Sequence, residues 1–136
     1  YIDGDIVVRD KIMNYLLSKS KNKDIVFQND KRPSKPNLIN MCAGFMFIKS
    51  SKKTQKFFNP ENINSKKFNE YTTHDQTYIN RNLAKFNYAS LPLDLFPNGP
   101  HYYKNHETLK PKIIHFNYLL GDKKKDEMIK YNQWFL

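Results

Sequence analysis

The chain opens with two carboxylates separated by one glycine, in the segment Asp3-Gly4-Asp5. Residues two apart in an extended backbone face the same side, so both carboxylates can point at one ligand. A divalent cation between them would turn their repulsion into attraction, and hard oxygen ligands suit magnesium or manganese. Gly4 lets another backbone or a ligand approach closely. The alternative interpretation is a solvated acidic turn at the end of a strand.

Near the other end of the chain, His115 follows two isoleucines and precedes Asn117, Gly121 and a run of three lysines at positions 123–125. An imidazole can ligate a cation, while the free amides of a glycine turn and nearby ammonium groups attract anions. A pyrophosphate bound to a divalent cation would need this combination. The alternative is a hydrogen-bonded core histidine beside a surface turn.

Two segments in the middle of the chain could contribute to the same site, one through polar side chains and the other through a close backbone approach. Asp75 and Gln76 stand at the start of a predicted helix, where they either cap the helix or grip sugar hydroxyls. In the second role, the carboxylate could stabilise a developing positive charge. Gly44 lies in an apolar run of bulky residues, which indicates that another group approaches the backbone there. Cys42 has no nucleophile-activating partners in the pattern and is interpreted as a small buried side chain.

Predicted strands and helices alternate along the chain, which favours an α/β fold with a mainly parallel or mixed sheet. Strands are expected at residues 6–8, 24–28, 40–48, 88–91 and 112–116. A first helix should be capped by Asp10 and should bury Ile12, Tyr15, Leu16 and Leu17. Further helices are expected from residues 50–51 to about 59, at 73–86 with the capping pattern Thr73-x-x-Gln76, and at 126–131. Loops are expected at 29–37 and 61–71, and a turn at 96–100.

The composition narrows the class of protein and the kind of partner. The chain has 136 residues, 39% of them hydrophobic, which suffices for one ordinary domain with a packed core. No stretch approaches the roughly 20 apolar residues of a membrane span. The net charge of +10 favours an anionic partner. Nearly all of this excess is lysine rather than arginine, which disfavours nucleic acid as the partner, since base readout usually relies on arginine.

Taken in order, these segments resemble the nucleotide-diphospho-sugar transferase family, metal-dependent glycosyltransferases of the GT-A fold that are related in pattern to the glycogenin-like family. The resemblance covers nearly the whole chain and is carried by YIDGDIVV (1–8), NMCAGFMFIKS (40–50), HDQTYINRNL (74–83), LPLDLFPNG (91–99), IIHFNYLLGDKKK (113–125) and Trp134. It implies an α/β fold with a GT-A-type, Rossmann-like mixed sheet flanked by helices, forming a single partial domain over residues 1–136. Because the family places a nucleotide-binding βαβ region before the Asp-x-Asp motif, we expect a fragment incomplete at its N-terminus, with weak or no activity by itself.

The resemblance also implies a role for each matched position. Asp5 would be the more direct ligand of manganese or magnesium, with Asp3 shared between the metal and the nucleotide ribose and His115 completing the metal site. Asp75 and Gln76 match the pair at the sugar and acceptor subsite and are the candidate catalytic residues. The remaining donor-binding positions are Asn40 and Gly44 beside the sugar, Asn117, and, at the diphosphate, Gly121 with either Lys124 or Lys125.

The implied reaction moves a sugar from a nucleoside-diphosphate sugar to a hydroxyl of a glycan, protein or small molecule, with retention of anomeric configuration. Two alternatives are a non-catalytic basic module that binds an anionic ligand or nucleic acid, and a phosphatase-like hydrolase. The hydrolase would need Asp-x-Asp-Gly-Thr, whereas Asp5 precedes Ile6 and Val7. The segment as it stands favours the cytoplasm, and an anchor upstream of it would instead place it in the Golgi lumen.

Overall fold

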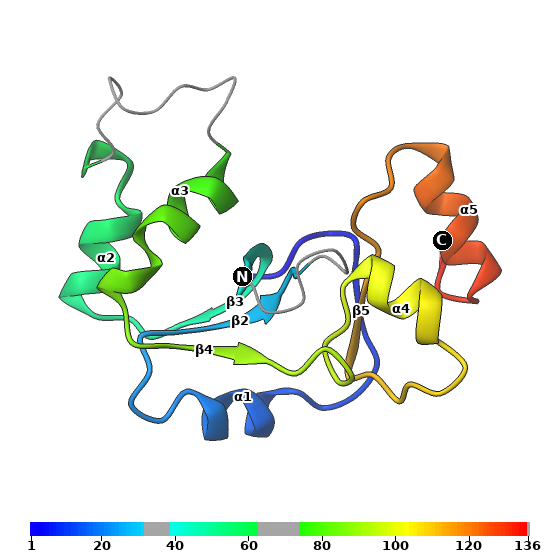
Figure 1. Cartoon of the computed structure of the whole chain (residues 1–136), viewed down its shortest axis with the longest axis horizontal. Coiled ribbons are helices and arrows are strands. Elements are labelled where there is room, and N and C mark those ends of the chain that lie inside the picture. Colours follow the sequence, from blue (N-terminus) through cyan, green and yellow to red (C-terminus); the bar gives the residue numbers. More distant parts are fainter. Residues whose placement is uncertain (32–38, 63–73, 136) are drawn as a thin grey trace.

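The structure, a computed structural model, describes residues 1–31, 39–62 and 74–135, and in these ranges strands and helices alternate (Figure 1). The strands are β1 (Ile6–Val8), β2 (Ile25–Asn29), β3 (Met41–Ile48), β4 (Tyr88–Leu91) and β5 (Ile113–His115). The helices are α1 (Met13–Lys19), α2 (Lys52–Phe58), α3 (Asp75–Asn82), α4 (Gly99–Asn105) and α5 (Asp122–Lys130), with 3-10 turns η1 (Pro60–Asn62) and η2 (Leu83–Lys85).

The strands form a mixed arrangement, which confirms the predicted α/β class. In a three-stranded sheet of order β3-β2-β4, the central strand β2 runs antiparallel to β3 and parallel to β4. A second sheet pairs β1 antiparallel with β5, so segments from the two ends of the chain are neighbours. An isolated bridge between Ile2 and Phe45 ties the first residues to β3. The start of the chain therefore lies against both sheets.

Helices cover both faces of the three-stranded sheet (Figure 1) because β2 is apolar on both sides. Ile25 and Phe27 pack in a core with residues of α3 and η2, while Val26 points into a second core that includes Leu16 of α1. Successive side chains of a strand face opposite sides of a sheet, so this alternation follows from strand geometry. The central strand is thus fixed from above and below.

A third core positions the end of β5. Ile114 and Phe116 pack with Tyr102 of α4 and Met128 of α5, and all four side chains are buried. His115 lies between them in sequence and therefore projects to the opposite side of β5. On that side its imidazole contacts Asp5 near the start of the chain and Gln28 of β2.

Several local predictions are wrong, each for an identifiable reason. Asp10 does not cap α1, because its carboxylate pairs with Lys112 and accepts a hydrogen bond from the adjacent Lys11 amide. Leu17 is 52% exposed, since α1 buries one narrow stripe around Leu16. The expected turn at 96–100 gives way to α4, and α5 begins at Asp122 rather than at 126.

The start of α4 has a clear physical cause. The Asn98 side chain accepts a hydrogen bond from the amide of His101, as an N-cap does, and Pro100 occupies the first turn, where its missing N–H has no helical partner to lose. Residues 32–38 of the first expected loop, 63–71 of the second and Thr73 of the expected capping pattern lie outside the described residues.

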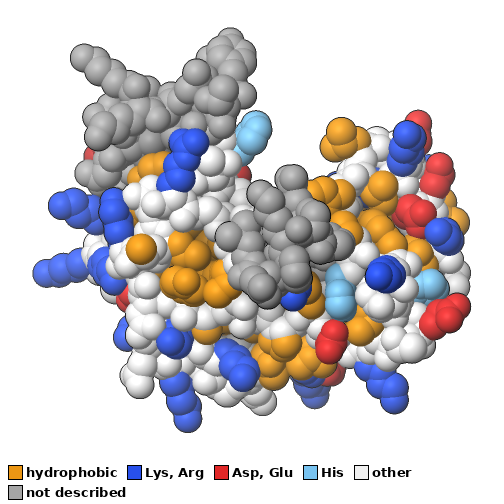
Figure 2. Space-filling model, in the orientation of Figure 1, with side chains coloured by type: hydrophobic (Ala, Val, Ile, Leu, Met, Phe, Trp, Pro, Cys, Tyr) orange, Lys and Arg blue, Asp and Glu red, His pale blue; other side chains and the backbone are white. Residues whose placement is uncertain are grey.

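On the face shown in Figure 2, lysine and arginine side chains are spread over the periphery and do not gather into one patch. Among the described residues, every helix is too short or too polar to cross a membrane.

Candidate active site

Asp3, Asp5 and His115 come together where the start of the chain meets β3 and β5. One ligand atom from each of the three side chains lies within 4.8 Å of the other two, and His115 is buried while both aspartates are partly buried. At that separation, two carboxylate charges repel by about 3 kcal/mol at an effective dielectric near 20. Two carboxylates and an imidazole are a donor set that suits manganese or magnesium. The three residues therefore fit a divalent cation.

Gly44 in β3 lies directly against the candidate metal ligands Asp3 and His115. A methyl group added at Gly44 would lie 2.5 Å from Asp3 Oδ2 and 2.8 Å from His115 Cε1. The Gly44 carbonyl also accepts a hydrogen bond from the Asp3 amide at 2.8 Å. The close approach expected from the small residue in a bulky strand is therefore present, and the approaching groups are the candidate ligands themselves.

His115 and Lys124 both contact the Asp5 carboxylate. His115 Nε2 lies 3.2 Å from Asp5 Oδ1, and Lys124 Nζ lies 2.6 Å from Asp5 Oδ2. The hydrogen bond from His115, followed by the contact with Lys124, holds the pKa of the Asp5 carboxyl well below its usual range although burial opposes this. Asp5 is thus ionised at neutral pH, as a metal ligand must be.

The sequence left open whether Lys124 or Lys125 contacts the diphosphate. In the structure their side chains point in different directions. Lys124 lines the pocket above Asp5, whereas the ammonium of Lys125 lies 5.6 Å from the ring centroid of Trp134. Gly121 precedes the first turn of α5 and has a φ of +54°, a conformation that favours glycine. Its open backbone and Lys124 thus lie in one turn beside the candidate metal ligands.

Asp30, which immediately follows β2, is the polar centre of the pocket and was missed by sequence reasoning. It is 4% exposed, and its carboxylate accepts hydrogen bonds from four side chains at 2.8–3.2 Å: Gln76, Asn98, Asn117 and Tyr118. These donors come from α3, the start of α4 and the segment after β5. Asn117 is therefore held by Asp30, and its own side-chain oxygen accepts from the amide of Gly99.

Gln28, two residues before Asp30, is the second residue that was missed. It is fully buried, and its Oε1 lies 2.7 Å from His115 Nδ1. A signal was available in the sequence: Gln28 and Asp30 are polar residues at i and i+2 at the end of an apolar strand. The same spacing argument that singled out Asp3 and Asp5 applies to them.

Asp75 and Gln76 lie at the first turn of α3, on the rim of this pocket. The Gln76 side chain accepts from the Ala43 amide at 3.1 Å and donates to Asp30. Asp75 is exposed, and one of its oxygens accepts from the Gln76 amide. Gln76 is thus fixed between strands, whereas Asp75 faces the solvent.

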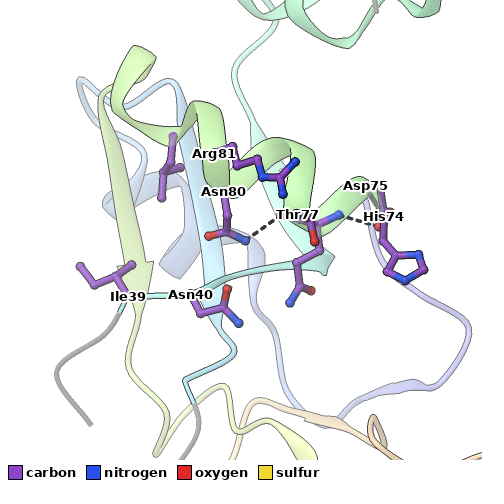
Figure 3. A pocket seen from close by; sticks show the side chains of 9 residues that line it. Ile39, Asn40, His74, Asp75, Thr77, Asn80 and Arg81 are labelled. Atoms are coloured by element: carbon purple, nitrogen blue, oxygen red, sulfur yellow. Dashed lines mark hydrogen bonds between the residues drawn. The ribbon is translucent and has the colours of Figure 1, made fainter. Parts of the chain in front are cut away.

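Two pockets meet at Asp75 and Gln76. One, of about 450 Å³, contains Asp3, Asp5, Gly44, Asp30, His115, Asn117 and Lys124. The other, of about 760 Å³, has Asn40 and Ile39 on one side and, on the other, His74 and residues of α3 such as Arg81 (Figure 3). Asn40 therefore lies in the neighbouring pocket, where its side chain donates to the Asp30 carbonyl.

Cys42 is 2% exposed, which confirms its interpretation as a small buried residue. Burial, followed by the charge of Asp30, raises the pKa of its thiol to about 12. A thiol that stays protonated at neutral pH is a poor nucleophile.

Comparison with known proteins adds an independent observation. The family model for nucleotide-diphospho-sugar transferases matches residues 1–128. A UDP-galactose:fucoside alpha-3-galactosyltransferase from Dictyostelium discoideum is 31% identical over 122 residues, an alignment that covers 71% of this chain and 18% of that protein. The chain thus spans about a fifth of the length of that curated relative. No solved structure matches significantly.

Proposed function

The chain belongs to the nucleotide-diphospho-sugar transferase family, and from this premise we propose that it carries the donor half of a metal-dependent glycosyltransferase site of the GT-A type. The donor is a nucleoside-diphosphate sugar and the acceptor a hydroxyl group. UDP-galactose and a fucoside are the first substrates to test, since the related galactosyltransferase is named for them. The observation that carries the proposal is the convergence of Asp3, Asp5 and His115 from opposite ends of the chain.

The charge of the smaller pocket supports the dependence on a metal. Among the described residues, its lining has aspartates at positions 3, 5, 30 and 75 and the ammonium of Lys124. A diphosphate entering this pocket alone would meet more negative than positive charge. A divalent cation held by Asp3, Asp5 and His115 would supply the Lewis acid that neutralises the departing diphosphate. Manganese or magnesium fits this donor set.

Other residues of the chain bind the diphosphate and orient the sugar. Lys124 and the open backbone at Gly121 bind the diphosphate and stabilise the negative charge that develops on it as the sugar departs. The Gln76 side chain, fixed between Ala43 and Asp30, orients the sugar, and Asp30 keeps that amide in place. Asp75 faces the developing positive charge of the sugar at the border of the two pockets.

The larger pocket is the proposed acceptor side. It adjoins the donor pocket at Asp75 and Gln76, so an acceptor hydroxyl bound there would reach the same sugar. Its polar lining of Asn40, Asn80, His74 and Arg81 suits a glycan (Figure 3). We propose retention of configuration on the strength of the family resemblance.

The test is transfer from UDP-galactose to a synthetic fucoside by the intact protein with Mn²⁺, followed by mass spectrometry of the product. Transfer should stop with EDTA and in Asp5→Asn, and it should persist in Asp126→Asn, an identical substitution at an exposed aspartate of α5. A panel of other nucleotide sugars tests the donor. Transfer that survives both EDTA and Asp5→Asn would contradict the metal assignment. Thermal stabilisation by oligonucleotides instead of by Mn²⁺ with UDP would favour a basic binding module.

A further inference from the structure

The buried amide of Gln28 contacts the ring nitrogen of His115 that faces away from the aspartates. Gln28 Oε1 lies 2.7 Å from His115 Nδ1, while His115 Nε2 lies 3.2 Å from Asp5. Both residues are at most 3% exposed, so water does not compete for this contact. Gln28 is therefore placed to fix the ring orientation that directs Nε2 toward the candidate metal site.

The orientation of the Gln28 amide is fixed by its other end. Its Nε2 lies 3.1 Å from the carbonyl oxygen of Phe96 and 2.7 Å from that of Pro97. Carbonyl oxygens only accept hydrogen bonds, so the group facing them must be the NH₂. The oxygen of the amide then faces His115, and an oxygen without a proton can only accept from Nδ1–H.

We infer that Gln28 is a positioning residue that keeps a proton on Nδ1 of His115 and thereby orients the ring with Nε2 toward Asp5 and the metal site. A metal-ligating histidine typically donates its other ring N–H to an acceptor, which sets both the tautomer and the orientation of the ring. Here the acceptor is a neutral side chain anchored to the backbone before α4. The inference rests on the metal site of the proposed function and on no particular substrate.

Cys42 is the competing partner within reach of the same nitrogen. Its Sγ lies 3.7 Å from His115 Nδ1, and a thiol could donate to Nδ1 if that nitrogen carried no proton. The Gln28 contact is an ångström shorter and involves a stronger acceptor, so Gln28 rather than Cys42 should be the hydrogen-bond partner of Nδ1. The variant Cys42→Ala, which removes this thiol, therefore serves as the control in the experiment below.

The first measurement is the tautomer of His115 in the metal-free intact protein, by long-range ¹H–¹⁵N correlation NMR of histidine-labelled protein at pH 8.5. The resonance is assigned from its loss in His115→Gln, and the chain contributes four histidines. We expect Nδ1 to carry a proton, both in the wild type and in Cys42→Ala. A neutral ring protonated at Nε2 in the wild type would overturn the inference without any substitution at Gln28.

The second measurement is Mn²⁺ affinity, by electron paramagnetic resonance of the free ion. Gln28→Leu should weaken Mn²⁺ binding by about 10- to 100-fold. Gln133→Leu is the matched control, because Gln133 is 5% exposed and its side chain bonds to Arg9 and Tyr131, not to His115. Equal Mn²⁺ affinity in folded Gln28→Leu and wild type would overturn the role of Gln28. Failure of the wild type itself to bind Mn²⁺ would instead contradict the proposed metal site.

Discussion

Gly44→Ala tests whether the candidate metal site depends on the close packing of β3 against its ligands. The new methyl group would lie 2.5 Å from Asp3 Oδ2, whereas ordinary contact begins at 3.4 Å, so the carboxylate would have to move by about 0.9 Å. Metal–ligand distances tolerate about ±0.2 Å, so a shift of this size removes a ligand. His115 cannot give way easily, because it is 3% exposed and bonded to Gln28.

Two effects of different size follow from this geometry. Overpacking should cost about 1–3 kcal/mol of the free energy of unfolding, measured by urea denaturation. Mn²⁺ affinity, measured by calorimetry, should fall by at least about 10-fold, since one of three protein ligands is displaced. Gly4→Ala is the control: it lies between the two aspartates, yet a methyl group there meets nothing within 4 Å. Wild-type Mn²⁺ affinity in Gly44→Ala, or an equal loss in Gly4→Ala, would refute the reasoning.

Three further outcomes follow from the contacts of single side chains. Lys124→Met should weaken binding of UDP in the presence of Mn²⁺ by about 10-fold or more, as a charge-assisted contact is lost, whereas Lys125→Met should bind UDP normally; calorimetry distinguishes them. The pKa of Asp5 is lowered in the folded protein, so its stabilisation is present above the ordinary value of 3.8 and is lost as the pH falls below it. Urea titrations of the metal-free protein should therefore show a stability loss on acidification that is smaller in Asp5→Asn, and parallel curves would contradict this assignment. Cys42, with its thiol pKa raised to about 12, should resist alkylation at pH 8 until the protein is unfolded, and rapid labelling of the native state would disprove its burial.

The sequence predicted the fold class well because the apolar runs are unambiguous. Val26 and its neighbours read as a buried strand, and β2 is the central strand with cores on both sides. The wrong predictions of helix caps and helix starts lie at the ends of elements, where a single polar contact decides which residue begins the helix. Asp10 has the side chain of a good cap but is taken by Lys112, a partner 102 positions away that no local pattern contains.

The candidate site was predicted where a residue type is informative by itself. Asp3, Asp5 and His115 carry groups that bind metals, and the structure brings them together. Gln28 and Asp30 were missed because Gln28 was read only as the end of a strand, and Asp30 as part of a loop. Their i, i+2 spacing was a signal in the sequence, but their hydrogen-bond partners lie far away along the chain and are visible only in the three-dimensional structure.

The position of β2 explains why segments so far apart in sequence form one site. Its C-terminal end lies between the strand that follows it, β3, and the segments around α4 and β5, so polar side chains at that end can reach all of them. Gln28 uses this position to hold His115, and Asp30 uses it to hold Gln76 and Asn117. These hydrogen bonds are buried or partly buried, where an unpaired polar group costs about 1–3 kcal/mol. The polar end of β2 therefore connects the elements of the candidate site, as its apolar start connects the two cores on either side of the sheet.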